Sequence, residues 1–287
     1  MPASRNIIQI IGMSTLRLFV LIVLFFLGFM LWDIFSKGAG VVSLEFIFDF
    51  PRKGMTEGGI FPAVVGTVFI TLVTTLFAIP FGIAAAIYLS EYAVDSPLNR
   101  LIRAAIRNLA GVPSIIYGLF GVAIFVQGLG FDTSILSAGL TLGLLTLPYI
   151  ITTTEEALKN VPHSYREGAL ALGATKWEAI RTNVLPSAVS GIVTGAILGL
   201  SRAAGETAPI LFTGAAFYLR YLPSSVFDEF MALPYHLYIL STQHHAIAEV
   251  RPLAYGTAVV LLGLVFILNI IAFIIRYRYR NFNKNRT

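Results

Sequence analysis

The sequence predicts an all-α integral membrane protein with six transmembrane helices, on three grounds: its composition, the length of its apolar runs and the placement of its basic residues. Hydrophobic residues make up 56% of the 287 and charged residues only 12%, whereas soluble domains average about 25% charged residues. A helix needs roughly 20 mostly apolar residues to cross a hydrocarbon layer about 30 Å thick. Six stretches are suitable: Leu16–Phe35, Phe61–Leu89, Ile106–Leu129, Ser134–Ile151, Ala188–Phe212 and Leu253–Ile275.

The first span is expected to remain in the protein as an anchor. Its apolar run continues through Leu31, Trp32, Asp33 and Ile34 without a small-residue cleavage site, and secretory signal peptides end in such a site. Residues 1–59 are therefore predicted to form an N-terminal anchor helix followed by a loop outside the membrane.

The basic residues predict the orientation. Most of them fall in the loops that share a side with both termini, and the opposite side holds only Lys37, Arg52, Lys53, Arg220 and Arg251. Cytoplasmic loops of membrane proteins carry the excess of Lys and Arg, so both termini are expected in the cytoplasm. The basic tail 277–287 is interpreted as a topology anchor beside membrane lipid, with no nucleic-acid partner.

Two spans contain residues that do not suit a regular helix. Gly111 and Pro113 are expected to bend the third span and expose backbone groups to a cavity, although a simple packing role remains open. In the fifth span Arg202 and Glu206 are four residues apart, so on a helix they share a face and can pair. Pro209 removes one helical hydrogen bond and is expected to bend that helix.

The inside loop 152–186 carries the signals of short capped helices. Thr154 precedes Glu155 and Glu156, which is typical of an N-cap followed by acids at the positive end of a helix. Ser164 and Glu167 then have the S-x-x-E spacing of a capping box. We expect this second helix to end at the glycine that follows Leu172.

A further capping box is predicted at Thr175 and Glu178, opening a helix that runs to Pro186. The two helices leave an apolar face that nothing nearby in the sequence covers: Ala169, Leu170, Leu172, Trp177 and Ile180. Such a face docks on a partner or on lipid. The glutamates of this loop disfavour an anionic lipid surface, so a protein partner is favoured.

The outside loop 218–251 is too polar to span. Its run FMALPYHLYIL is too short for a seventh span and is interpreted as a re-entrant or surface helix facing an external partner. His236, His244 and His245 lack a nearby acid at ligand spacing, so no metal site is expected, and the chain has no cysteine.

The inside loop carries a family resemblance. EGALALG (167–173), nine further residues and then NVLP (183–186) are similar to the cytoplasmic signature E-A-A-x3-G-x9-I-x-L-P of ABC importer permeases. Gly168 replaces the usual alanine and Asn183 the usual aliphatic residue. The positions that match are Glu167, Ala169, Gly173, Leu185 and Pro186.

Three longer stretches, Gly66–Tyr92, Asn108–Gly121 and Ser201–Gly214, resemble the phosphate-importer permease subunits of the PstA type, and the resemblance extends from about Gly66 to Arg276. It implies a MetI-like permease core over 60–276 in the cytoplasmic membrane of a prokaryote. It also implies three partners: a second permease subunit (PstC type), a dimeric ATPase subunit (PstB type) and an extracytoplasmic phosphate-binding protein.

The resemblance implies that helix Ser164–Leu172 is the coupling helix, which docks on the ATPase. The chain itself has no phosphate-binding loop, because none of its lysines follows a glycine as G-x-x-x-x-G-K-[ST] requires. We expect neither catalytic residues nor a bound cofactor, with ATP and Mg used by the partner. The residues assigned to the coupling loop are Ser164, Glu167, Gly168, Ala169, Leu172, Gly173, Leu185 and Pro186.

Three hypotheses explain Arg202 and Glu206. They form a structural ion pair, or they line the path of an oxyanion, or they form a gate between subunits. Ionisable residues within membranes usually serve function, which favours path or gate, with Ser201 and Thr207 as candidate hydroxyl donors. The leading function is phosphate import. The alternatives are import of molybdate, tungstate or a phosphonate by the same architecture, and an ATP-independent channel.

Overall fold

The computed structural model describes residues 2–284, so the last three residues of the predicted tail 277–287 lie outside the described residues. The chain is almost wholly helical. Its α-helices are α1 (Pro2–Gly38), α2 (Leu44–Phe48), α3 (Phe61–Ile87), α4 (Pro97–Leu109), α5 (Ser114–Gly121), α6 (Ile135–Lys159), α7 (His163–Ala171), α8 (Lys176–Ala179), α9 (Leu185–Gly205), α10 (Ala208–Thr213), α11 (Leu233–Thr242) and α12 (Ile247–Lys284).

The remaining elements are small. A hairpin pairs β1 (Pro51–Arg52) with β2 (Glu57–Gly58) in antiparallel fashion, around the 3₁₀ turn η1 (Lys53–Met55). Three π-helical turns extend or join the long helices: η2 (Tyr88–Tyr92), η3 (Val122–Gly128) and η4 (Ile180–Val184).

The six predicted spans correspond to five continuous helices and one bent pair. Within residues 2–284, the helices long and apolar enough to cross a membrane are Gln9–Gly38, Phe61–Tyr92, Ile135–Lys159, Lys176–Gly205 and Ile247–Arg278. The sixth consists of Pro97–Leu109 and Ser114–Gly128, which meet at 105°. The all-helical, multi-spanning prediction is therefore confirmed, but the third predicted span is not one helix.

The fifth predicted span is wrong at both ends. The helix does not stop near Pro186, because the π-helical turn η4 leads directly into α9 and Pro186 lies in the first turn after it. A π-helical turn changes the hydrogen-bond register, which lets a helix pass a proline. At the other end α9 stops at Gly205, and Glu206 has extended backbone angles (φ −74°, ψ 135°). Pro209 begins α10 instead of bending one long helix.

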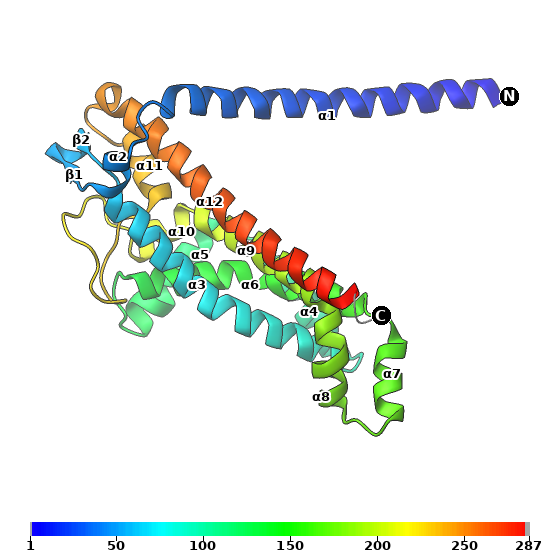
Figure 1. The fold of residues 1–287 in the computed structure, drawn as a ribbon. Coiled ribbons are helices and arrows are strands. Elements are labelled where there is room, and N and C mark those ends of the chain that lie inside the picture. The colour runs from blue at the N-terminus through cyan, green and yellow to red at the C-terminus, as the bar shows by residue number, and fades with distance from the viewer. Residues whose placement is uncertain (1, 285–287) are drawn as a thin grey trace.

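Close approach of small residues holds the centre of the bundle together. A Cβ added at Gly195 of α9 would lie 1.8 Å from Thr153 Oγ1 of α6, and one at Gly143 would lie 2.4 Å from Phe77 Cδ1 of α3. Glycines at such contacts let transmembrane helices pack backbone to backbone. Helix α6 is accordingly the most buried span, whereas α1 diverges from the bundle and contacts the start of α12 (Figure 1).

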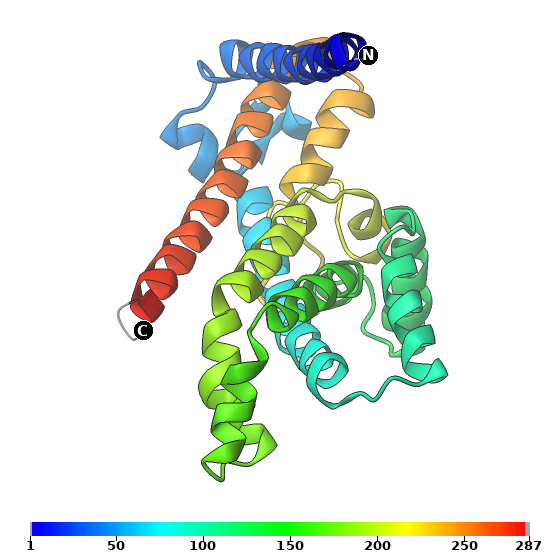
Figure 2. The ribbon, with the colours of Figure 1, turned by 90° about the vertical axis from the view of Figure 1, so that its right-hand side faces the viewer.

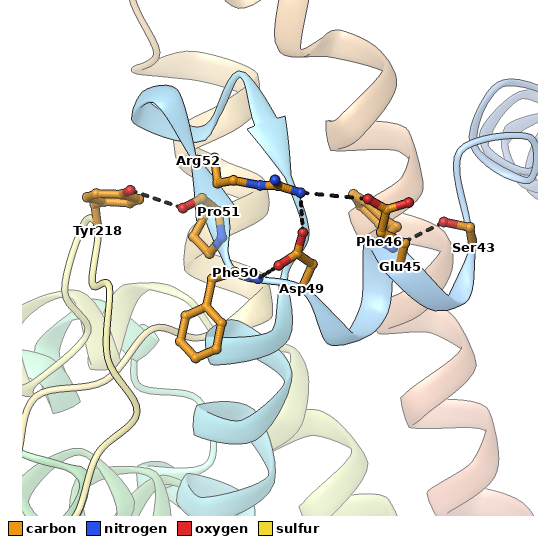
Figure 3. A network of polar contacts seen from close by, with 8 residues as sticks. All are labelled: Ser43, Glu45, Phe46, Asp49, Phe50, Pro51, Arg52 and Tyr218. Atoms are coloured by element: carbon orange, nitrogen blue, oxygen red, sulfur yellow. Dashed lines mark hydrogen bonds and ion pairs between the residues drawn. The ribbon is translucent and has the colours of Figure 1, made fainter.

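The two ends of the bundle differ. At one end α7 and α8 project side by side beyond the spans (Figure 2). The opposite end is covered by α2, the β hairpin and α11 (Figure 1). Figure 3 shows the polar contacts between α2, the hairpin and the loop that contains Tyr218. There Arg52 bonds to Asp49 and lies 3.7 Å from Glu45, while the Tyr218 hydroxyl donates to the Pro51 carbonyl at 3.0 Å.

Helix α11 is the helix expected from the FMALPYHLYIL run. It packs into the same apolar cluster as the start of α12, with Leu233, Ile239 and Leu240 buried. Burial, and to a smaller extent the nearby His244, lowers the pKa of His236 to about 4. Within residues 2–284, no three acidic or histidine side chains are grouped so that they could hold a metal ion.

Candidate functional site

The structure brings Arg202 and Glu206 together although they no longer share a regular helix. Arg202 lies in the last turn of α9, and Glu206 caps the end of that helix with its side chain turned back. Arg202 Nε lies 3.3 Å from Glu206 Oε1, with 41% of the arginine side chain exposed and 16% of the glutamate side chain. The predicted pair therefore exists at the break between α9 and α10.

A tyrosine of α6 completes this site. The Nη1 of Arg202 donates to the Tyr149 hydroxyl, and the guanidinium carbon lies 4.8 Å from the centre of the Tyr149 ring. Sequence reasoning missed Tyr149 because it is 53 residues from Arg202 and no local spacing connects the two. The only available signal was a hydroxyl-bearing aromatic residue close to the end of the fourth predicted span, Ser134–Ile151.

The same tyrosine connects the ion pair to the bend in the third predicted span. Helix α4 ends at Leu109, and Gly111 and Pro113 lie in the bend that precedes α5. The carbonyls freed there accept hydrogen bonds: Ala110 from the Tyr149 hydroxyl at 3.0 Å, and Leu109 from the Tyr117 hydroxyl at 2.8 Å. Two features predicted separately, the bend and the ion pair, therefore meet at one place.

The two candidate hydroxyl donors lie differently. The Ser201 hydroxyl donates to Asn269 Oδ1 of α12 at 2.9 Å, so it serves the contact between α9 and α12. Thr207 precedes the first turn of α10 and makes no side-chain capping bond to it. Of the four residues predicted for a path or gate, the structure joins Arg202 and Glu206 to each other and directs Ser201 toward another helix.

The exposure of Arg202 has a physical consequence. Tyr149, its partner, lies in the middle of α6, a helix long and apolar enough to cross a membrane, so we infer that the guanidinium lies within the membrane. A charged side chain at that depth costs at least about 2.5–3.5 kcal/mol if it faces lipid. With 41% of the side chain uncovered, this surface is suited to face water or another polypeptide.

A second site is the projecting helix pair. Helix α7 begins at His163 after Pro162, and no side chain caps it, so the predicted capping box of Ser164 and Glu167 is wrong. Proline at the N-cap fixes the chain direction there, which places Ser164 inside the first turn, two residues after the N-cap position.

The turn between α7 and α8 follows the sequence prediction. Gly173 has φ +87°, its N–H donates to the Leu170 carbonyl, and the Ala174 N–H donates to the Ala169 carbonyl. These two bonds and the left-handed glycine form a Schellman motif. The second predicted capping box is also confirmed, because Glu178 Oε2 accepts from the Thr175 N–H at 2.7 Å and the Thr175 hydroxyl accepts from the Glu178 N–H at 3.3 Å.

The helix predicted to start at Thr154 does not exist. Thr154 and Glu155 are interior residues of α6, which runs on to Lys159, and both are buried. Glu155 pairs with Arg103 of α4 and, at 2.8 Å, with Lys159. The acid that seemed to open a new helix is therefore the buried partner of a cation on a different helix.

A buried arginine fastens α7 to the bundle. Arg166 Nε and Nη2 donate to the two carboxylate oxygens of Glu91 at 3.0 and 2.6 Å. The same guanidinium donates to the Val161 and Leu158 carbonyls, both at 2.9 Å. The side chains of Arg166 and Glu91 are only 17% and 6% exposed. Arg166 thus links α7 to η2, the π-helical turn that follows α3, and to the end of α6, which sequence reasoning also missed.

The outer surface of this helix pair is apolar and uncovered. Leu172 is 91% exposed, and Leu170 and Trp177 are each 49% exposed. Of the other residues predicted for this loop, Gly168 lies on the open side of α7, while Leu185 and Pro186 begin α9. Because Arg166 holds α7 to the bundle and the helix has an exposed apolar surface, α7 is suited to bind in a groove of another protein.

Comparison with known proteins agrees with this architecture. Residues 78–281 match the family described as "Binding-protein-dependent transport system inner membrane component". The phosphate transport system permease protein PstA of Xylella fastidiosa is 37% identical over 69% of this chain and 69% of its own length. PstA 1 of Mycobacterium tuberculosis is 34% identical over 88% of this chain and 83% of its own length. A probable ABC transporter permease protein, YqgI of Bacillus subtilis, is 31% identical over 83% and 85%.

Solved structures show the same fold. A chain of the MetNI methionine ABC transporter in an inward-facing conformation matches with a TM-score of 0.62 at 20% identity, over 76% of this chain and 94% of its own length. A chain of a bacterial alginate ABC transporter, in complex with an alginate-bound periplasmic protein, matches with a TM-score of 0.67 at 13% identity, over 90% and 91%.

The chain is thus a multi-pass inner-membrane permease subunit of an ABC importer and not an enzyme. Importers of this kind work with an ATPase and a substrate-binding protein. Its helical bundle, its projecting helix pair and the match over most of its length lead to one conclusion: this chain belongs to the family of binding-protein-dependent transport system inner membrane components.

Proposed function

We propose that this permease subunit translocates inorganic phosphate across the cytoplasmic membrane by alternating access, driven by a separate ATPase. The observation that carries the proposal is the Arg202 side chain, which is 41% exposed at the break between α9 and α10, with its guanidinium beside Tyr149. The names of the PstA relatives support phosphate as the substrate. Guanidinium groups bind phosphate oxygens in a bidentate, charge-assisted manner.

The pairing of Arg202 suits transport better than tight binding. An isolated cation in a low-dielectric site would hold an oxyanion strongly and release it slowly. Glu206 at 3.3 Å offsets part of that charge, and Tyr149 links the guanidinium to the bend at Ala110. We assign Arg202 as a transient binding site for the anion. We assign the bend between α4 and α5 as the place where helix movement changes the surroundings of Arg202.

The proposed assembly contains a PstC-type permease subunit, a dimeric PstB-type ATPase and an extracytoplasmic phosphate-binding protein. The surface of α7 and α8 is assigned to the ATPase, and the end that bears α11 and the β hairpin to the binding protein. Both termini are placed in the cytoplasm, because the excess of basic residues lies on that side. This chain binds no cofactor in the proposal, and ATP and Mg are used by the ATPase.

The substrate is tested by uptake into vesicles that contain the reconstituted complex and its binding protein. We expect ATP-driven uptake of labelled phosphate, competed by unlabelled phosphate but not by sulfate, molybdate, tungstate or methylphosphonate. A complex that hydrolyses ATP in response to its binding protein but moves one of the other anions would overturn the phosphate assignment. Uptake without ATP would favour a channel.

The Gly173→Val variant tests the turn between α7 and α8. The left-handed backbone at Gly173 (φ +87°) costs a residue with a Cβ about 1–2 kcal/mol, and a β-branched side chain adds to this. We expect the helix pair to shift and more ATP to be hydrolysed per phosphate imported. Gly168→Ala is the matched control, because a Cβ there meets nothing within 4 Å and Gly168 lies inside α7. Normal coupling in Gly173→Val would contradict the docking assignment.

A further inference from the structure

A groove opens where α1, α11 and α12 meet, at the end of the bundle opposite α7. Its volume is about 610 Å³, within the range of about 300–1,000 Å³ typical of small-molecule sites. Helix α1 contributes Ile34 to the groove and diverges from α12 beyond it (Figure 1). It is lined by Ile34, Leu237, Leu240, Ser241, Ile247, Ala248, Arg251, Ala254, Tyr255 and Ala258.

Arg251 gives this groove a positive charge that no direct ion pair among the described residues neutralises. Its side chain is exposed, and among residues 2–284 no acid forms an ion pair with it. Asp33 of α1 is close enough to attract Arg251. However, Asp33 is already bonded to Lys37 at 2.5 Å and accepts from the Tyr255 hydroxyl at 3.3 Å. The guanidinium therefore retains its donors for an anion.

The groove lies at the level where a membrane changes from hydrocarbon to headgroups. Asp33, Lys37 and Arg251 are found where the apolar runs of α1 and α12 end. Trp32 is 73% exposed beside them, and tryptophan is enriched at membrane–water interfaces. The apolar wall of the groove, including Ala258, lies further along α12 toward the hydrocarbon.

We propose that this groove binds an anionic glycerophospholipid. The phosphate is held by Arg251, with the hydroxyl group of Ser241 as a neighbouring donor, and one acyl chain follows the apolar wall of the groove between Ile34 of α1 and Ala258 of α12. The charge pattern favours a lipid over a protein helix, since Arg251, the cation of the groove lining, lies at the headgroup end of an apolar cleft. Bound there, the lipid lies beside the anchor helix α1.

The test is native mass spectrometry of the whole transporter complex, stripped of lipid in detergent and titrated with phosphatidylglycerol or phosphatidylcholine. We expect the wild type to bind phosphatidylglycerol more tightly than phosphatidylcholine. Arg251→Gln is expected to weaken binding of phosphatidylglycerol roughly tenfold, as for the loss of a charge-assisted hydrogen-bonded contact. Arg220→Gln is the matched control, because Arg220 is exposed at the same end but stacks on Tyr218 away from the groove.

A second variant tests the acyl-chain part without changing any charge. Ala258→Phe fills the apolar wall and is expected to reduce lipid binding while the basic residues remain. The ATPase activity of each complex reports whether it is folded and assembled. Equal binding by the wild type and both groove variants would overturn the proposal. So would equal losses in Arg220→Gln, which would indicate unspecific attraction, or displacement of the lipid by millimolar inorganic phosphate.

Discussion

Arg202→Gln is expected to lower ATP-driven phosphate uptake roughly 10- to 100-fold, the range for losing a hydrogen-bonded contact to a charged group. Glutamine keeps a polar side chain near Tyr149 and Glu206 but removes the cation that would receive the anion. Because the variant leaves the surface of α7 and α8 untouched, the complex should still assemble and hydrolyse ATP. Uptake into proteoliposomes and ATP hydrolysis are measured on the same preparation.

The controls separate the charge from the fold. Arg202→Lys keeps the charge but cannot bond in a bidentate manner, so it should retain intermediate uptake. Arg100→Gln is the matched control, since Arg100 is an exposed arginine of α4 whose weak pair with Asp95 spans 3.7 Å. It should transport normally. Unchanged uptake by Arg202→Gln would rule out both the path and the gate.

Substitutions of Tyr149 and Glu206 distinguish the three hypotheses for the pair of Arg202 and Glu206: a structural ion pair, a path and a gate. Tyr149→Phe keeps the ring beneath Arg202 and removes the hydroxyl that bonds Ala110, so it should slow transport if the bend and the pair move together. Glu206→Gln leaves the arginine uncompensated. If the pair lines the path of the anion, this change should raise the apparent affinity for phosphate and lower the maximal rate of uptake. If the pair is a gate, it should allow phosphate to leak through without ATP. A purely structural pair would show lower thermal stability with normal uptake per assembled complex.

Local signals in the sequence predicted much of the fold. Apolar runs located the spans, Gly173 and the Thr175 capping box located the turn between α7 and α8, and Gly111 and Pro113 marked the bend. Each depends on residues within a few positions of one another, whose conformations are restricted by sterics and by local hydrogen bonds. Such effects act before any tertiary contact forms.

The predictions failed where tertiary contacts overrode local preference. The two acids after Thr154 look like the start of a helix, but Glu155 is buried against Arg103, 52 residues away. Pro186 looks like a helix end, yet the π-helical turn η4 carries the helix past it. Tyr149 was missed for the same reason, since only the packing of α6 against α9 brings it to Arg202.

The buried pair of Arg166 and Glu91 is the clearest long-range feature of the coupling region. The two residues are 75 positions apart, and the arginine makes two carboxylate and two carbonyl contacts. Arg166→Met should leave Glu91 buried without a partner, which costs about 3–5 kcal/mol for a pair of this kind. Thermal unfolding of the purified complex should show the loss, and the fraction of complex that retains its ATPase should fall.

The same replacement at an exposed ion pair provides a comparison for the stability loss of Arg166→Met. Arg100→Met removes a pair whose side chains are 66% and 82% exposed, and such pairs contribute about 0–1 kcal/mol. A similar loss in both variants would mean that burial of Arg166 is not the cause. The contrast between the two arginines therefore tests the structure itself, independently of the substrate.

The double variant Glu91→Met with Arg166→Met separates stability from coupling. Replacing both members of a buried ion pair by apolar residues is often close to neutral, so the double variant should recover much of the stability that Arg166→Met loses. Recovery stays partial, because the Val161 and Leu158 carbonyls also lose a donor. If the pair transmits the movement of α7 to η2 after α3, the stable double variant should still hydrolyse ATP without importing phosphate. Normal import by that variant would restrict the pair to holding the fold.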